Sequence, residues 1–364
     1  MIQLQITRDI IGYLQTRARN ERARAEVANI VERWLLSAAN ARSNGDLPRG
    51  SNGDLPRGAN GDLPRGSNGD LLRRSNRIYM WVHSGSAANA KMAAELVEKK
   101  IAHSDTGAAE LMTRVMQIVS EGVSACANTH SARVVVAQCR GGLECAVELA
   151  GSGEIVFNQP LDGATEALIK MRSCTAALAV AVRYAVIASG GQQWGLPRNH
   201  VRELHRLHGV RNEAFASPLN SRLLGLPDTH FCSLFPDTDG PFGSLGDFFA
   251  VDLAATPGNW VVNPPFVEAL IERAAARCLA ACAGASAAEI TFYFVVPAWR
   301  DARFYQMLHE SPHCAAELAL EPGRYYYETP AGARVPTRAP SVYFALSSKK
   351  TAAHVRALRQ ILDA

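Results

Sequence analysis

Residues 260–270 read WVVNPPFVEAL, an apolar run that stops at an asparagine and two prolines before a helical pattern begins. Two consecutive prolines remove two backbone donors and exclude the helical conformation from the residues just before them. The stretch therefore predicts a buried strand, a rigid extended elbow with outward carbonyls, and a helix over residues 267–283. We expect a ligand to lie against this elbow.

Further strands surround the elbow in the C-terminal half of the chain. Apolar runs, several bounded by Pro, Gly, Asp and Asn, predict strands at residues 213–216, 230–235, 247–252, 260–262, 290–296, 317–320 and 341–346, with another helix at 352–362. This series is typical of a doubly wound α/β sheet, whose ligands bind at the carboxyl ends of the strands. The loops FASPLN, FPDTDG, NPPF and VPAWR would all fall at that edge.

An octapeptide repeat interrupts the N-terminal part. Residues 43–74 read SNGDLPRG, SNGDLPRG, ANGDLPRG and SNGDLLRR. One leucine per unit buries too little surface to offset chain entropy, so the repeat predicts a disordered linker. The chain is thus expected to comprise an N-terminal helix at 1–42, the linker at 43–77, a helical domain with a small antiparallel meander at 78–209, and an α/β domain at 210–364.

The composition limits the classes of protein. The chain has 364 residues, and its formal charge of +4 suits a nucleic-acid surface and an ordinary protein equally. Eight cysteines without a CxxC pair argue against zinc and against a disulfide framework, and favour a reducing, intracellular compartment. No run of eighteen apolar residues occurs and the N-terminus is charged throughout, so neither a membrane span nor a signal peptide is predicted.

The elbow can act on a planar amino group. The exocyclic nitrogen of adenine is a poor nucleophile because its lone pair is delocalised into the ring. Two acceptors aimed at its two hydrogens draw that lone pair out of the plane, and the Asn263 side-chain oxygen and the Pro264 carbonyl form such a pair. Pro265 helps to hold them rigid and Phe266 can stack on the base. The elbow thus predicts transfer by positioning, with the donor carbon within roughly 3 to 3.5 Å of the nitrogen.

Four motifs in order resemble a known family. They are NEAFASPLN at 212–220, CSLFPDTDGPFGS at 232–244, NPPFVEAL at 263–270 and FVVPAWRD at 294–301. In order and spacing they resemble the phosphorylated CTD-interacting factor family over about residues 201–348. The resemblance implies a Rossmann-type, S-adenosylmethionine-dependent methyltransferase domain. Its substrate would be the capped 5′ end of mRNA, methylated on N6 of the first transcribed adenosine, in the nucleus rather than the cytoplasm.

The resemblance also implies site residues. Facing the methionine part of S-adenosylmethionine would be Ala216, Ser217, Pro218 and Asn220. The ribose hydroxyls would be bound by Asp237 or Asp239, with Asp239 favoured. The catalytic elbow would be Asn263, Pro264, Pro265 and Phe266. The RNA would meet Trp299, Arg300 and, on a second aromatic rim, Arg324. No metal ligands are expected.

The sequence departs from the family at two places. A WW domain, which in the familiar members reads the phosphorylated polymerase tail, needs two tryptophans about twenty residues apart, whereas Trp34 and Trp81 flank the repeat. We therefore expect no WW domain, which argues against binding to the polymerase tail. Residues 324–340 also look unlike the family.

Other acceptors remain open at this stage. The same elbow suits adenine in internal RNA or DNA, or a glutamine amide in a protein, and a second methylation of the same nitrogen is compatible with it. A catalytically silent RNA-binding scaffold is the alternative from another class, although a silent scaffold has no need for Asn263. The oligomeric state and the role of the N-terminal helix are not indicated by the sequence.

Overall fold

The structure is a computed structural model of the chain and describes residues 2–43, 86–126, 132–139, 142–149, 155–160, 163–172, 174–184, 193–284, 289–323, 325–337, 339–349 and 351–363. The octapeptide repeats from residue 44 onward, and with them nearly all of the predicted linker, lie outside these residues. So does Arg324. The chain divides into two compact units, of which one comprises Met1–Leu161 with Ala185–Gly190 and the other Asp162–Tyr184 with Gly191–Ala364.

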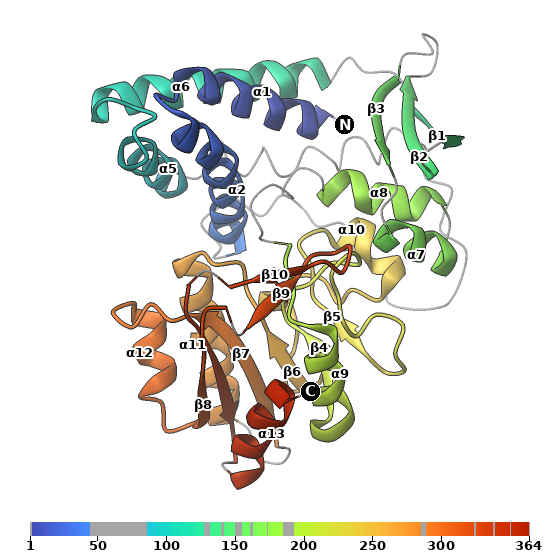
Figure 1. The fold of residues 1–364 in the computed structure, drawn as a ribbon, viewed down its shortest axis with the longest axis vertical. Helices are drawn as coiled ribbons and strands as arrows, with labels where there is room; N and C mark the ends of the chain where they lie inside the picture. The colour runs from blue at the N-terminus through green and yellow to red at the C-terminus, as the bar shows by residue number, and fades with distance from the viewer. Residues whose placement is uncertain are drawn as a thin grey trace. The chain divides into compact units, whose positions relative to one another are not determined.

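The first unit contains helices and one small sheet (Figure 1). The helices are α1 (Ile2–Arg17), α2 (Glu21–Ser43), α5 (Ser86–Glu98) and α6 (Asp105–Cys126), and the strands β1 (Ala132–Cys139), β2 (Gly142–Leu149) and β3 (Ile155–Pro160) form an antiparallel sheet in the order β1-β2-β3. The single N-terminal helix expected at 1–42 is two helices. The Asn20 side chain accepts a hydrogen bond from the Ala23 amide at 2.8 Å, which caps the start of α2 and separates it from α1.

A six-stranded mixed sheet forms the second unit. Its strands are β4 (Val210–Glu213), β5 (His230–Phe231), β6 (Asn259–Val262), β7 (Thr291–Pro297), β8 (Cys314–Leu320) and β11 (Ser341–Ser347), in the order β5-β4-β6-β7-β11-β8. Strands β5, β4, β6 and β7 are parallel to one another, whereas β11 is antiparallel to both of its neighbours. The expected α/β class with a mostly parallel central sheet is therefore confirmed.

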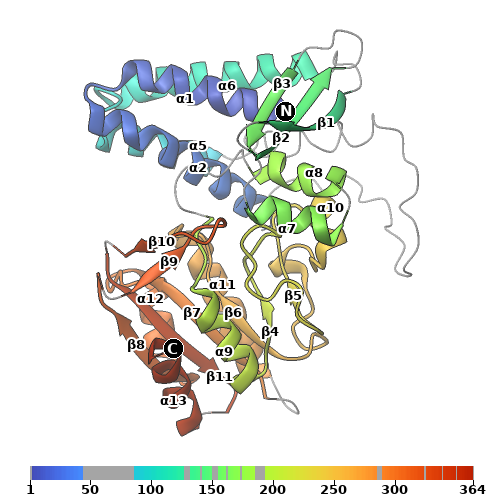
Figure 2. The same ribbon diagram turned by 45° about the vertical axis from the view of Figure 1, so that its right-hand side comes forward.

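Helices cover both faces of this sheet (Figure 2). Helices α11 (Glu268–Gly284) and α12 (Arg303–His309) pack on one face, and α9 (Arg198–His208) and α13 (Ala352–Asp363) pack on the other. Every residue of β7 is buried, with Phe292, Phe294 and Val296 in one core and Tyr293 and Val295 in the other. A strand with two covered faces needs apolar residues at every position, which explains its continuous apolar sequence.

Several sequence-based boundaries differ from the structure, among them the strand expected at 213–216, which is β4 at Val210–Glu213, and the strand expected at 230–235, which ends at Phe231. The strand expected at 247–252 is instead a 3₁₀ turn, η2 (Phe248–Ala250), because the Asp247 carboxylate accepts the Phe249 amide at 3.0 Å and caps the turn. The helices α7 (Gly163–Met171), α8 (Cys174–Tyr184) and α9 fall within the helical domain that the sequence predicts at 78–209. In the structure they belong to the same compact unit as the sheet.

A short hairpin not expected from the sequence lies within residues 324–340. It consists of β9 (Tyr326–Glu328) and β10 (Arg334–Pro336) and is joined to the segment before α9 by a β-bridge between Gly195 and Glu328. In the part of the chain that is described, every helix is too short or too polar to cross a membrane.

The turn before β6 requires a glycine. Gly258 has φ +94°, and a Cβ there would lie 2.8 Å from the Cβ of Arg211. Gly243 has a similar φ of +97° with nothing within 4 Å of the same position. We expect Gly243→Ala to lower the free energy of unfolding by about 1 kcal/mol through backbone strain alone, and Gly258→Ala to lower it by a further ~1–3 kcal/mol because Arg211 must move. Urea unfolding of both variants measures the difference, and equal losses would contradict the steric role of Arg211.

Candidate active site

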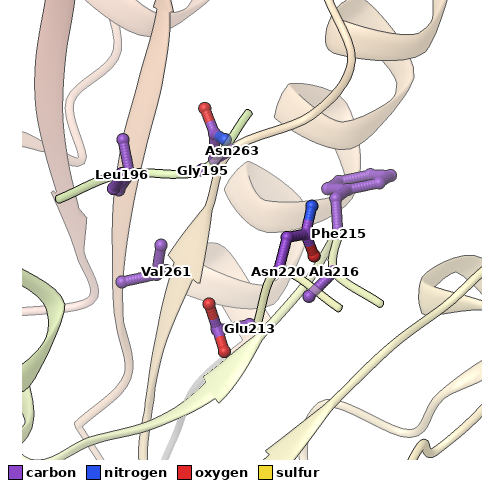
Figure 3. Close-up of a pocket in the computed structure, with 8 residues that line it drawn as sticks. All are labelled: Gly195, Leu196, Glu213, Phe215, Ala216, Asn220, Val261 and Asn263. Atoms are coloured by element: carbon purple, nitrogen blue, oxygen red, sulfur yellow. The ribbon is translucent and has the colours of Figure 1, made fainter. Parts of the chain in front are cut away.

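A pocket lies where the strand order of the sheet reverses. From β4 the chain adds β5 on one side and then β6 on the other, and loops that leave the carboxyl ends of β4 and β6 diverge there. The pocket is small, with a cavity volume of about 10 Å³, and is lined by Gly195, Leu196, Glu213, Phe215, Ala216, Asn220, Val261 and Asn263. Figure 3 shows Asn263 at one end of this pocket and Glu213 at the other.

Glu213 anchors the loop that follows β4. The residue is 6% exposed, and its carboxylate accepts hydrogen bonds from the Ser221 hydroxyl, from the Arg222 amide at 2.9 Å and from the Leu223 amide at 3.1 Å. Burial raises the pKa of Glu213, and these hydrogen bonds oppose that rise. Residues 214–229, all of which are described, contain turns and no helix. The loop after β4 is therefore held by its hydrogen bonds to the Glu213 carboxylate and not by helical hydrogen bonds.

The FASPLN loop is fixed by its own polar side chains. The Asn220 side-chain oxygen accepts the Ser217 amide at 2.7 Å and the Ser217 hydroxyl at 3.0 Å, and the Asn220 amide group donates to the Gln193 carbonyl at 3.2 Å. Of the four residues expected to face a cofactor, Ala216 and Asn220 line the pocket. Ser217 is 1% exposed and Pro218 is buried, and neither lines the pocket.

The elbow leaves β6 and enters α11. Asn263 is half-buried and lines the pocket, and its amide group donates to the Trp194 carbonyl at 3.4 Å, which leaves its oxygen as an acceptor. Pro264 is buried and Pro265 half-buried, and the Pro265 carbonyl accepts the Val267 amide at 2.7 Å just before the helix. This bond spans two residues and closes a tight turn between the second proline and the helix.

Aromatic rings support the elbow from the neighbouring strand. The ring of Phe266 lies edge-on to Tyr327 at 6.1 Å and to Trp299 at 6.5 Å between centroids. Trp299 follows β7 and is 43% exposed, and Arg300 next to it is exposed with its guanidinium 5.7 Å from the ring of Tyr305. The structure thus brings Phe266 and Trp299 together on one rim, with Arg300 adjacent in the chain.

The two expected ribose ligands lie apart from this pocket. Asp239 is fully buried, where its carboxylate accepts the Tyr184 hydroxyl at 2.6 Å and the Thr238 hydroxyl at 3.1 Å. Asp237 pairs with Arg183 at 3.1 Å. Neither residue lines the pocket, because the short helix α10 (Pro236–Asp239) turns both carboxylates toward α8. The preference for Asp239 as a ribose ligand is therefore not supported by this geometry.

Other residues of the site were not singled out from the sequence. Arg222, 1% exposed, donates from Nε to the Leu196 carbonyl at 2.8 Å and from Nη2 to the Glu328 carbonyl at 3.0 Å. A Cβ on Gly195 would lie 2.9 Å from Nη2 of Arg222, so the glycine lets the guanidinium pass close to the backbone. The charged Glu213 before the FASPLN motif was the signal available in the sequence, whereas the role of Arg222 depends on partners far along the chain.

Comparisons with known proteins agree with the family resemblance. A protein-family model described as "Phosphorylated CTD interacting factor 1 WW domain" matches residues 165–329. Proteins of mouse and human, both named mRNA (2'-O-methyladenosine-N(6)-)-methyltransferase, are 39% identical to the chain over 111 residues. The aligned part is 30% of this chain and 15% of the length of each relative.

The match corrects one expectation. The sequence pattern of the tryptophans led us to expect no WW domain, but the matching family model carries that description. In the structure the matched residues run from α7 to β9 and include the pocket and the elbow. The argument against binding to the polymerase tail depended on the absence of a WW domain, so it no longer holds.

The buried Asp239 makes stability depend on pH. Burial raises the pKa of Asp239 from 3.8 to about 6, so between these values the folded chain binds a proton that the unfolded chain releases. The free energy of unfolding should therefore fall as pH rises from about 4 to about 6, by on the order of 3 kcal/mol. Asp239→Asn should flatten this slope, as measured by urea unfolding at several pH values. Identical slopes in the two proteins would contradict the assignment.

Proposed function

We propose that the chain is an S-adenosylmethionine-dependent RNA adenosine N6-methyltransferase that acts on the adenosine next to an mRNA cap. The observation that carries the proposal is the Asn263-Pro264-Pro265-Phe266 elbow at the carboxyl end of β6, beside the pocket at the reversal of strand order. The names of the mouse and human relatives give a 2'-O-methyladenosine of mRNA as their acceptor, and the position next to the cap is taken from the family resemblance. The proposal implies a nuclear location.

The sheet supports a Rossmann-type methyltransferase domain. Small-molecule cofactors of doubly wound sheets bind at the switch point, and here that point carries a pocket next to the elbow. Ala216 and Asn220 of the FASPLN loop line the pocket, and the Glu213 carboxylate lies at one end of it. S-adenosylmethionine, a sulfonium with an ammonium group, fits these residues and supplies an activated methyl group when bound.

The residues of the elbow then orient the acceptor. The Asn263 oxygen and the Pro264 carbonyl accept the two hydrogens of the adenine amino group, which turns the nitrogen lone pair toward the pocket. Phe266, held edge-on by Tyr327 and Trp299, stacks on the base. The amino nitrogen would gain the methyl group as the bond of that group to the sulfonium sulfur breaks and leaves a thioether, and it would lose one proton to solvent, so these residues need not change their own protonation.

Replacing the elbow amide should separate chemistry from cofactor binding. We expect Asn263→Ala to lower methyl transfer at least ~100-fold, because it removes an acceptor that positions the nucleophile. The affinity for S-adenosylmethionine should stay within about tenfold. Transfer from labelled S-adenosylmethionine and calorimetric titration measure the two quantities. A variant that keeps its activity, or one that loses its fold, would contradict a catalytic role for Asn263.

Matched RNAs decide the acceptor. We expect wild-type protein to methylate an RNA that begins with a capped adenosine, and to transfer little to the same RNA with a triphosphate in place of the cap or with another first base. Mass analysis of the product distinguishes one methyl group from two. Equal transfer to every RNA would exclude the cap-adjacent assignment, and failure to bind S-adenosylmethionine would exclude the enzyme altogether.

A further inference from the structure

Trp194 is an exposed tryptophan beside the elbow, and the proposed reaction gives it no part. Its indole is 39% exposed, although tryptophan is among the residues that proteins bury most. Within the described part of the chain, the exposed large apolar side chains include two aromatic residues, Trp194 and Trp299. Both are attached to the elbow, since Trp299 packs on Phe266 and the Trp194 carbonyl accepts the Asn263 amide group.

The backbone that carries Trp194 is held at each residue. Four consecutive carbonyls, from Gln193 to Leu196, accept hydrogen bonds from three separate segments of the chain. The donors are Asn220 Nδ2 to Gln193 at 3.2 Å, Asn263 Nδ2 to Trp194 at 3.4 Å, the Glu328 amide to Gly195 at 2.9 Å and Arg222 Nε to Leu196 at 2.8 Å. The exposed indole is thus attached to a fixed backbone, which lowers the entropy cost of binding against it.

The position of Trp194 is close to the reacting group. The next residue, Gly195, lines the pocket together with Asn263. A ligand bound at the Asn263 amide therefore lies close to the Trp194 backbone. An exposed cation, Arg198, follows four residues later at the start of α9. Proteins that bind single-stranded nucleic acids combine exposed rings, on which bases stack, with cations that contact phosphates, and Trp194 and Arg198 supply one of each within four residues.

We propose that Trp194 stacks on the base next to the acceptor adenosine. The substrate is then a single-stranded RNA segment in which at least two nucleotides are unstacked, one at Phe266 and one at Trp194. The inference rests on the proposed function and names the form of RNA that the same site takes. A protein partner would need an apolar area much larger than one indole, and exposed apolar residues elsewhere, such as Leu207 and Val355, lie on other elements.

A binding cycle tests the inference. The probes are two fluorescein-labelled, capped RNAs of sequence AUUU, one intact and one with an abasic nucleotide directly after the adenosine. We expect Trp194→Leu to weaken binding of the intact RNA ~5- to 100-fold, the range for loss of one stacked base. The abasic RNA should bind wild type and Trp194→Leu equally, because neither complex contains the stacked pair. Fluorescence anisotropy at one fixed salt concentration measures all four affinities.

Two further variants control the result. Trp194→Phe keeps an aromatic face and should restore binding of the intact RNA to within about threefold of wild type. Leu207→Ala removes an exposed apolar side chain from α9 and should leave binding unchanged. Thermal unfolding checks that every variant is folded. If Trp194→Leu is not folded, two other results test the stacking: the affinity of Trp194→Phe for the intact RNA, and the affinity that wild type loses when the base is absent.

The outcomes separate this inference from the proposed function. Equal loss on intact and abasic RNA, or no loss on either, overturns stacking by Trp194 even where wild type methylates RNA. Stacking by Trp194 is also overturned if wild type binds the intact and the abasic RNA with the same affinity. That result is expected if the indole binds a protein and not a base. Conversely, a base-dependent loss without any methyl transfer would uphold the stacking and overturn the enzyme.

Discussion

The buried carboxylate of Glu213 is the constraint on which the geometry of the site depends. A carboxylate in a covered position must be supplied with donors, and here they come from Ser221, Arg222 and Leu223, which fold back from the loop after β4. That fold places the Arg222 side chain beneath residues 195 and 196. Arg222 in turn fixes the segment whose Trp194 carbonyl holds the Asn263 amide. The pocket is therefore positioned by one chain of polar contacts between two parallel strands.

The elbow has a second support, which is apolar. Phe266 contacts Tyr327 of the β9-β10 hairpin and Trp299 after β7, so rings from two other segments pack against it. The hairpin is itself tied to Gly195 by paired backbone hydrogen bonds of 2.8 and 2.9 Å. Polar contacts on one side of the elbow and aromatic contacts on the other leave the two prolines little freedom. A catalytic amide that acts only through its direction needs such confinement.

The sequence predicted the helices and strands better than it predicted the contacts between distant residues. The double proline and the apolar run before it predicted the end of β6 and the start of α11, because those are properties of adjacent residues. The run at 247–252 suggested a strand, but Asp247 caps a turn there, and a cap competes with extended structure over only a few residues. Asp239 could not be recognised as a partner of Tyr184, since 55 residues separate them. The importance of Arg222 and Trp194 likewise depends on the packing of distant segments.

The connection after β4 sets the electrostatics of the pocket. In many doubly wound folds a helix begins directly after the first strand, and the partial positive charge of its N-terminus attracts a phosphate. Residues 214–229, described throughout, offer no such helix, and the Arg222 and Leu223 amides of this connection donate to the Glu213 carboxylate instead. Those amides are therefore not available to a phosphate. This connection does not offer the anion site at which such folds hold the pyrophosphate of a dinucleotide.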